Sequence, residues 1–93
     1  MKQYELTIIA PDDLTVLDKI ELEKLIKRHA RLRKRLVDGR KRLAYPIQGR
    51  EWGLYLFYEL EMDRDQAVPM SSTLNTNDNV VRYLLVRKDT RGK

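Results

Sequence analysis

Cysteine is absent from the 93 residues of this chain, which excludes disulfide scaffolds, thiol catalysis and zinc–thiolate sites. Histidine occurs once, and with no clustered ligands His29 is expected at the edge of the core rather than on a metal. The longest apolar runs, residues 6–11 and 54–58, are far shorter than the ~20 residues of a membrane helix, so no membrane partner is expected. The first five residues lead into a strand-like segment, and we therefore expect no secretory signal.

The chain is long enough for one hydrophobic core and too short for a second. Hydrophobic residues make up 42% and charged residues 35% of it, a balance typical of a globular protein. We therefore expect a single domain over residues 1–93, with residues 89–93 as a short polar tail.

Basic residues are concentrated in one part of the sequence. The chain has 19 Lys and Arg against 14 Asp and Glu, a net charge of +5. Nine of the 19 fall between positions 27 and 42, where Asp38 is the sole acid: Lys27, Arg28, Arg31, Arg33, Lys34, Arg35, Arg40, Lys41 and Arg42. Such a run repels itself unless a polyanion neutralises it, so it favours nucleic-acid binding over a merely solvated face.

Hydrophobic periodicity predicts six elements of secondary structure. Strands are expected over residues 3–10, 40–47, 52–62 and 80–88, because apolar and polar residues alternate there. One helix starts near Val16, with Thr15 as its N-cap and an apolar stripe of Leu22, Leu25, Ile26, His29, Leu32 and Leu36. Residues 31–37 fit either its last turns or the next strand. A second helix is expected within residues 63–74, with Pro69 in its first turn.

The order β-α-β-β-α-β is that of the α+β, ferredoxin-like split βαβ fold. This fold is a four-stranded antiparallel sheet with both helices on one face. With Leu6, Ile8, Leu54, Leu56, Tyr58 and Leu60 in the core, the uncovered face carries Ile9, Tyr55, Phe57, Leu84 and Val86. Contiguous exposed apolar groups usually mark a surface that binds a partner.

Four segments carry a resemblance to a known family: Tyr4-Glu5, residues 39–47 (GRKRLAYPI), 53–62 (GLYLFYELEM) and 77–82 (NDNVVR). In this order and spacing they resemble the bacterial small-subunit ribosomal protein S-six family over nearly the whole chain. The resemblance implies the fold just described and a structural role in a bacterial-type, cytoplasmic ribosome, with an organellar ribosome left open. It also implies binding to the central domain of small-subunit rRNA as a heterodimer with ribosomal protein S-eighteen, without a cofactor.

The resemblance also implies site residues at matching positions. The rRNA contacts implied are Lys2, Arg40, Lys41, Arg42, Arg82 and Arg87. The protein-partner surface implied on the open face is Tyr55, Phe57, Leu84 and Val86. No catalytic residue and no metal ligand is expected.

This chain departs from the family pattern in two places that bear on the fold. The junction before Gly39 is several residues shorter than usual, which predicts that part of the second strand is truncated or replaced by residues 31–35. Pro69 interrupts a helix that is normally continuous. Tyr45 is expected as an aromatic at the core edge, and Trp52 either packs on the loop or contacts a partner.

Two other classes of protein share this topology. An RNA-recognition motif would stack bases on aromatics of its first and third strands, but the exposed positions of the first strand are Glu5, Thr7 and Ile9. An acylphosphatase-like enzyme would need a glycine-rich anion loop after that strand, where Pro11-Asp12-Asp13 stands instead. Glu59 and Glu61 could suggest acid–base catalysis, but on an exposed strand they are expected to be solvated or paired with a partner's arginines. We predict a protein without enzymatic activity.

Overall fold

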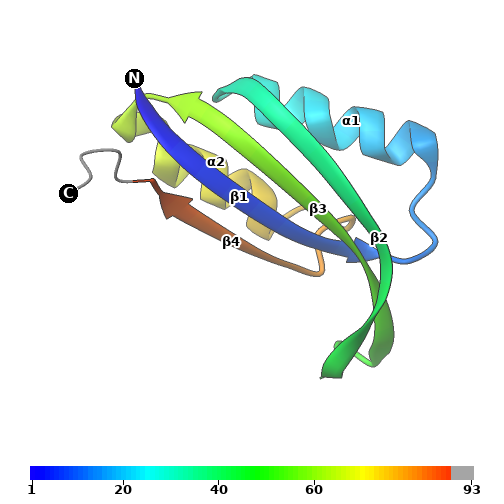
Figure 1. Ribbon diagram of the computed structural model, residues 1–93. Helices are drawn as coiled ribbons and strands as arrows, with labels where there is room; N and C mark the ends of the chain where they lie inside the picture. Colours follow the sequence, from blue (N-terminus) through cyan, green and yellow to red (C-terminus); the bar gives the residue numbers. More distant parts are fainter. Residues whose placement is uncertain (89–93) are drawn as a thin grey trace.

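The structure is a computed structural model that describes residues 1–88, so the predicted polar tail at 89–93 lies outside the described residues. Figure 1 shows a twisted sheet with its helices on one side. The elements, in chain order, are β1 (Lys2–Pro11), α1 (Val16–Lys27), β2 (Arg31–Ile47), β3 (Arg50–Met62), the short 3₁₀ helix η1 (Arg64–Gln66), α2 (Ala67–Asn75) and β4 (Arg82–Arg87).

The four strands form one antiparallel sheet in the order β2-β3-β1-β4. On the central strand β1, Leu6 lies opposite Tyr58 of β3 and Leu85 of β4. Both helices pack on the same face of this sheet (Figure 1). The predicted ferredoxin-like fold is therefore confirmed.

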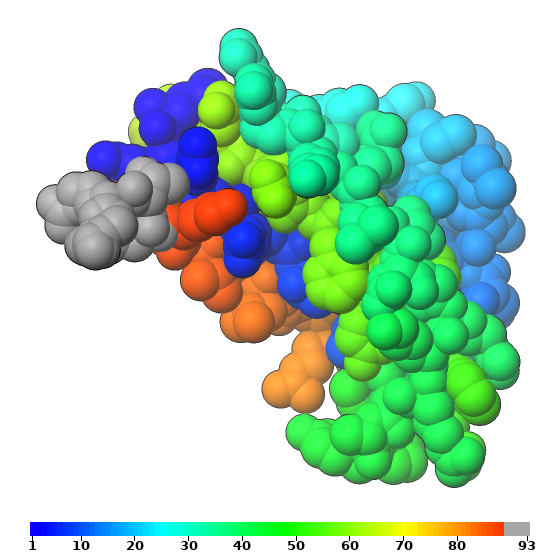
Figure 2. All heavy atoms as spheres, viewed as in Figure 1, coloured from blue at the N-terminus to red at the C-terminus, as the bar shows by residue number. Residues whose placement is uncertain are grey.

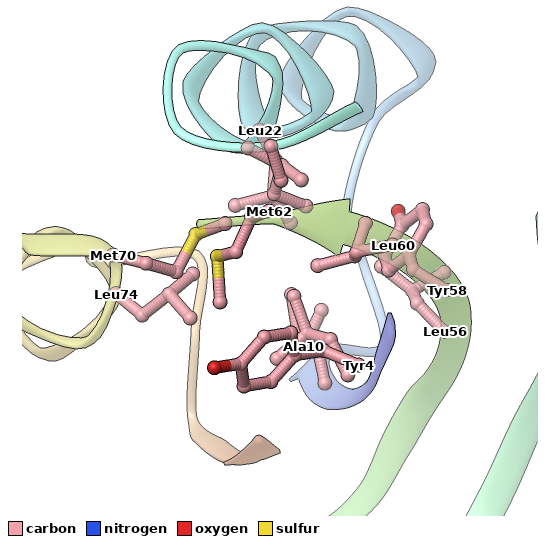
Figure 3. Packing of buried hydrophobic residues seen from close by; sticks show 13 residues of the cluster. Tyr4, Ala10, Leu22, Leu56, Tyr58, Leu60, Met62, Met70 and Leu74 are labelled. Atoms are coloured by element: carbon pink, nitrogen blue, oxygen red, sulfur yellow. The ribbon is translucent and has the colours of Figure 1, made fainter. Parts of the chain in front are cut away.

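The core fills the layer between the sheet and the helices. In Figure 3, Leu22 reaches down from α1, and Met70 and Leu74 approach from α2 toward the residues of β1 and β3. The buried cluster comprises Tyr4, Leu6, Ile8, Ala10, Leu22, Ile26, Ala30, Leu56, Tyr58, Leu60, Met62, Met70 and Leu74. Of the predicted core residues, all are buried except Leu54, which is partly buried and packs against the cluster.

Helix α1 begins as predicted, because the side chain of Thr15 accepts a hydrogen bond of 3.0 Å from the backbone N–H of Asp18. It ends at Lys27, earlier than the apolar stripe predicts. His29 lies in the turn that follows Lys27 and not on the helix, and residues 31–37, which fitted either helix or strand, belong to β2. A register shift between Leu32 and Lys34 then puts Leu32 on the covered face, opposite Leu60, and Leu36 on the other face, opposite Phe57.

The turn after α1 is tied to the second helical segment through His29. Its ring Nδ1 lies 3.0 Å from Oε1 of Gln66, and Nε2 lies 3.4 Å from Oγ1 of Thr73. The imidazole is therefore a partly buried connector at the edge of the core, as predicted. Residues 1–88 contain no group of three or more acidic or histidine side chains placed to hold a metal ion.

Pro69 is the third residue of α2 and so stands in its first turn, as predicted. First-turn N–H groups have no partner within the helix, so the missing N–H of proline costs little there. Met70 and Leu74, four residues apart, are then buried at 0% and 1% exposure. Neither α1 nor α2, the helices of the described part, is long and apolar enough to cross a membrane.

Strand β2 is 17 residues long, so of the two alternatives for the short junction, truncation or replacement by residues 31–35, the structure has the replacement. Residues 31–37 pair with β3 and supply the missing half of the strand. The β2–β3 turn at Gln48 and Gly49 has φ of 53° and 75°, the left-handed pair that a two-residue hairpin turn requires. Its tightness lets β3 start at Arg50 rather than at Trp52.

Candidate nucleic-acid and protein interfaces

The β2–β3 hairpin extends past the end of β1, whose last partner on β3 is Gly53 (Figure 1). We call residues 39–53 the hairpin arm. At its root Gly39 has a φ of 92° and lies at a register shift between Val37 and Gly39, which lets the strand twist away from the body. At its tip Nε2 of Gln48 donates a hydrogen bond of 3.4 Å to the carbonyl of Val81, so the arm curls back toward the start of β4.

Three of the predicted rRNA contacts, Arg40, Lys41 and Arg42, follow one another on the arm, with side chains 53%, 51% and 70% exposed. Each has an acidic neighbour. Arg40 Nε lies 2.8 Å from Asp12 Oδ2, Lys41 pairs with Asp38, and Arg42 Nη2 lies 3.8 Å from Glu51 Oε1. The pairs of Lys41 and Arg42 join exposed side chains, which contribute little to stability, so a phosphate can compete with Asp38 and Glu51 for these two cations. The hydrogen bond from Lys41 to Asp38 raises the pKa of this amine, which keeps its positive charge.

Arg50, at the tip of the arm, is a cation that the sequence patterns did not single out. It directly follows the turn at Gly49 and lies opposite Ile47. Among residues 1–88 no carboxylate lies within 4.0 Å of it, unlike the other three arginine and lysine positions of the arm. Its position after a Gln-Gly turn was the available signal.

The remaining predicted rRNA contacts divide between the two ends of the sheet. Arg82 starts β4 opposite Ile9, near the tip of the arm, since Gln48 and Arg82 line the same hollow. Lys2 and Arg87 lie at the opposite end of the sheet, where they are placed opposite Met62 and Tyr4. The structure thus brings Arg82 and the arm to one end and leaves Lys2 and Arg87 at the other.

The face of the sheet without helices carries the predicted partner surface, and Figure 2 views the molecule from this side. Phe57 is in register with Thr7 and Leu84 on one side and with Leu36 on the other. Tyr55 lies next along β3, with its ring centroid 6.3 Å from that of Phe57. The exposed fractions are 62% for Leu84, 45% for Val86 and 60% for Leu36. We call this set the open face: Ile9, Leu36, Tyr55, Phe57, Leu84 and Val86.

Leu36 was missed as a member of the open face, because its segment was ambiguous between helix and strand. A hollow of about 260 Å³ lies beside it, lined among others by Leu36, Phe57 and Glu59. Farther along the sheet, Glu5 lies 3.8 Å from Lys88 and Glu61 lies 3.8 Å from Arg33. Of the two carboxylates considered for acid–base catalysis, Glu59 and Glu61, the second is therefore paired with an arginine of the chain itself.

Tyr58 has the one side-chain hydroxyl of the described residues that is buried without a hydrogen-bond partner. Burial, with the nearby carboxylate of Glu23, raises the pKa of this phenol far above its usual value. Glu23 itself is held by Arg35, whose Nη2 lies 3.0 Å from Oε1. The phenol is therefore a neutral core side chain.

Two aromatics, Tyr45 and Trp52, belong to the arm itself. Tyr45 is 63% exposed, so its placement at the core edge was wrong, and the neighbouring Leu43 is buried instead. An irregular register between Arg42 and Ile47 decides which of these side chains turns inward. Trp52 packs within the arm, with the guanidinium carbon of Arg40 4.1 Å from the centre of its ring.

Comparison with known proteins identifies relatives along the whole chain. The family model described as "Ribosomal protein S6" matches residues 3–87. "Small ribosomal subunit protein bS6" of Corynebacterium aurimucosum is 37% identical, with 98% of this chain and 100% of that protein covered. Its counterpart in Corynebacterium glutamicum is 39% identical (96% and 99% covered), and that of Thermus thermophilus is 32% identical (94% and 91% covered).

The structural comparison agrees on the fold. The crystal structure of 30S ribosomal protein S6 from Thermotoga maritima superposes with a TM-score of 0.82, covering 94% of this chain and 87% of that one. The two sequences are 17% identical, so this likeness bears on the fold alone.

Proposed function

Since the chain belongs to the ribosomal protein S6 family, we propose that it binds small-subunit rRNA through its hairpin arm and a second ribosomal protein through its open face. Family membership makes it a structural, non-enzymatic constituent of the small subunit of a bacterial-type, cytoplasmic ribosome. The proposal adds the central domain of the rRNA as the nucleic-acid partner and ribosomal protein S-eighteen as the protein partner.

The observation that carries the rRNA proposal is the concentration of cations on a protruding arm. The side chains of Lys41 and Arg42 are at least half exposed, and those of their partners Asp38 and Glu51 are 38% and 63% exposed. Phosphates that replace those carboxylates release counterions from the RNA, so binding should weaken steeply with salt. Arginine can in addition pair with a phosphate through two parallel hydrogen bonds.

The rRNA proposal is tested by changing Lys41 and Arg42 together to glutamine. We expect weaker binding to a central-domain rRNA fragment and a slope of log K against log salt that falls by roughly 0.7–0.9 for each phosphate that the variant no longer neutralises. Changing Lys19 and Lys24 on α1 to glutamine removes the same charge away from the arm and serves as the control. An equal loss of affinity in both variants would mean that only net charge matters.

The protein-partner proposal depends on the open face. Apolar side chains from all four strands lie together there, and the central one, Phe57, is in register with Leu36 and Leu84. Apolar contact residues of this kind are typical of the centre of a protein interface. Ribosomal protein S-eighteen is the partner implied by the family resemblance.

For this surface, we expect Phe57→Glu to abolish binding to ribosomal protein S-eighteen in a calorimetric titration while the circular dichroism spectrum stays unchanged. A buried carboxylate without a partner is costly in an interface. Val68→Glu, at a position 77% exposed on α2, is the matched control and should bind normally. A folded Phe57→Glu variant that still pairs would refute the assignment of the open face.

A further inference from the structure

Arg40 differs from the other cations of the arm in having two partners at once. Its Nε donates a hydrogen bond of 2.8 Å to Oδ2 of Asp12, which lies in the turn after β1. Its guanidinium carbon also lies 4.1 Å from the ring centre of Trp52 on β3. One side chain of β2 therefore joins both strands of the arm to the body of the molecule.

The arm needs such a connection because it leaves the sheet. Beyond the pairing of Pro11 with Gly53, β1 no longer accompanies β3, and the arm continues as a two-stranded hairpin. A lone two-stranded hairpin is marginally stable in water, so contacts with the body must determine its direction. The contact at its root is that of Arg40 with Asp12, and the contact at its tip is that of Gln48 with Val81.

We infer that Arg40 is a positioning residue: with Asp12 and Trp52 it forms a latch that sets the direction of the hairpin arm, while neighbouring cations meet the RNA. This inference rests on the proposed rRNA function of the arm, and it revises the role that the family resemblance implies for Arg40. The Asp12 carboxylate compensates the charge of Arg40, and the indole covers one face of its guanidinium. A phosphate would have to displace both partners.

The electrostatics of the turn agree with this geometry. The hydrogen bond from Arg40 lowers the pKa of Asp12, so the carboxylate remains charged throughout the neutral range. The groups facing Asp12 are Arg40, which is the larger influence, and Arg50, whose charge acts in the same direction. The latch is thus closed at the pH at which ribosomes work.

The decisive experiment compares Asp12→Asn with Asp13→Asn. Both remove one negative charge at adjacent positions, but Asp13 is exposed and has no ion pair within 4.0 Å among residues 1–88. If Arg40 contacts phosphate directly, Asp12→Asn frees it and tightens binding to a central-domain rRNA fragment. If the latch positions the arm, Asp12→Asn weakens binding about three- to tenfold while Asp13→Asn does not.

The Arg40→Gln variant provides a second test, because its salt dependence of RNA binding differs between a positioning residue and a residue that contacts a phosphate. As a positioning residue it should lower the affinity without changing the salt slope, because the number of phosphates neutralised by the protein stays the same. A slope reduced by about 0.7–0.9 would instead show that Arg40 meets a phosphate and would overturn the inference.

The latch can also be followed without RNA, because Trp52 is the sole tryptophan of the chain. Its fluorescence emission and the hydrogen exchange of arm amides should change in Asp12→Asn and stay unchanged in Asp13→Asn. Equal behaviour of the two variants in these measurements would overturn the inference. If the unmodified protein fails to bind rRNA, the proposed function fails, whereas emission and exchange still decide whether the latch exists.

Discussion

Neighbouring residues of β3 meet two different environments on the two faces of the sheet. On the covered face, Leu56, Tyr58, Leu60 and Met62 are at most 3% exposed beneath the helices. On the open face, the equally apolar Phe57 remains partly exposed. The hydrophobicity of the strand is similar on both faces, so the difference comes from what covers each one. An apolar face that the chain's own helices leave uncovered is available to another molecule.

The largest effect expected from this comparison is on Leu56, which is 0% exposed. Leu56→Ala should lower the free energy of unfolding by about 2–5 kcal/mol, since it removes buried methyl groups and leaves a cavity. Phe57→Ala, one residue along on the open face, should cost clearly less. Urea unfolding of the two variants measures both values, and equal losses would contradict the distinction between the faces.

A smaller loss is expected at Gly53, where the arm meets the open face. A Cβ at this position would lie 2.6 Å from Cγ2 of Ile9 and 3.3 Å from Cδ2 of Leu43. Gly53→Ala should therefore destabilise the fold by about 1–3 kcal/mol through overpacking, as measured by urea unfolding. Ile9→Ala removes the nearest clashing atom, so the double variant should lose less than the sum of the single changes.

The smallest effect is expected at Tyr58, on the covered face. Because its hydroxyl has no hydrogen-bond partner, Tyr58→Phe should leave the melting temperature at pH 7 unchanged or slightly higher. Burial raises the pKa of this phenol, so the folded chain keeps a proton that the unfolded chain releases above about pH 10. Stability should therefore fall as the pH rises beyond that value.

The alkaline part of this prediction is tested by thermal unfolding between about pH 9 and pH 11, a range centred on the ordinary tyrosine pKa. The fall in melting temperature should be shallower in Tyr58→Phe than in the unmodified chain. Tyr45→Phe, at a position 63% exposed, should behave like the unmodified chain. A fall of the same steepness in all three would show that other groups govern the alkaline loss.

Much of the fold followed from local patterns in the sequence. Alternation along β3 placed Leu56 and Phe57 on opposite faces, and Thr15 marked the start of α1. Pro69 could be placed in a first helical turn because proline is tolerated there without loss of a hydrogen bond. These assignments depend on neighbours within a few residues, which the sequence contains directly.

The candidate site was less predictable. The concentration of cations near Arg40–Arg42 was visible, but the arm that presents them depends on pairing between β2 and β3. The strand conformation of residues 31–37 depends on that same pairing, and a register shift after Leu32 puts Leu32 and Leu36 on opposite faces of the sheet. The position of Leu36 on the open face could consequently be assigned only from the structure.

The sequence by itself determined the order of the elements, the two faces of the central strands and the family to which the chain belongs. Tertiary structure alone decided that Leu43 is buried and Tyr45 exposed, and that Arg40 bonds to an aspartate 28 residues away. The physical reason is that the hydrophobic periodicity of a helix or strand depends only on residues close together in the sequence. The partner of a charge, or the side chain that turns inward at a register shift, depends on how distant segments meet.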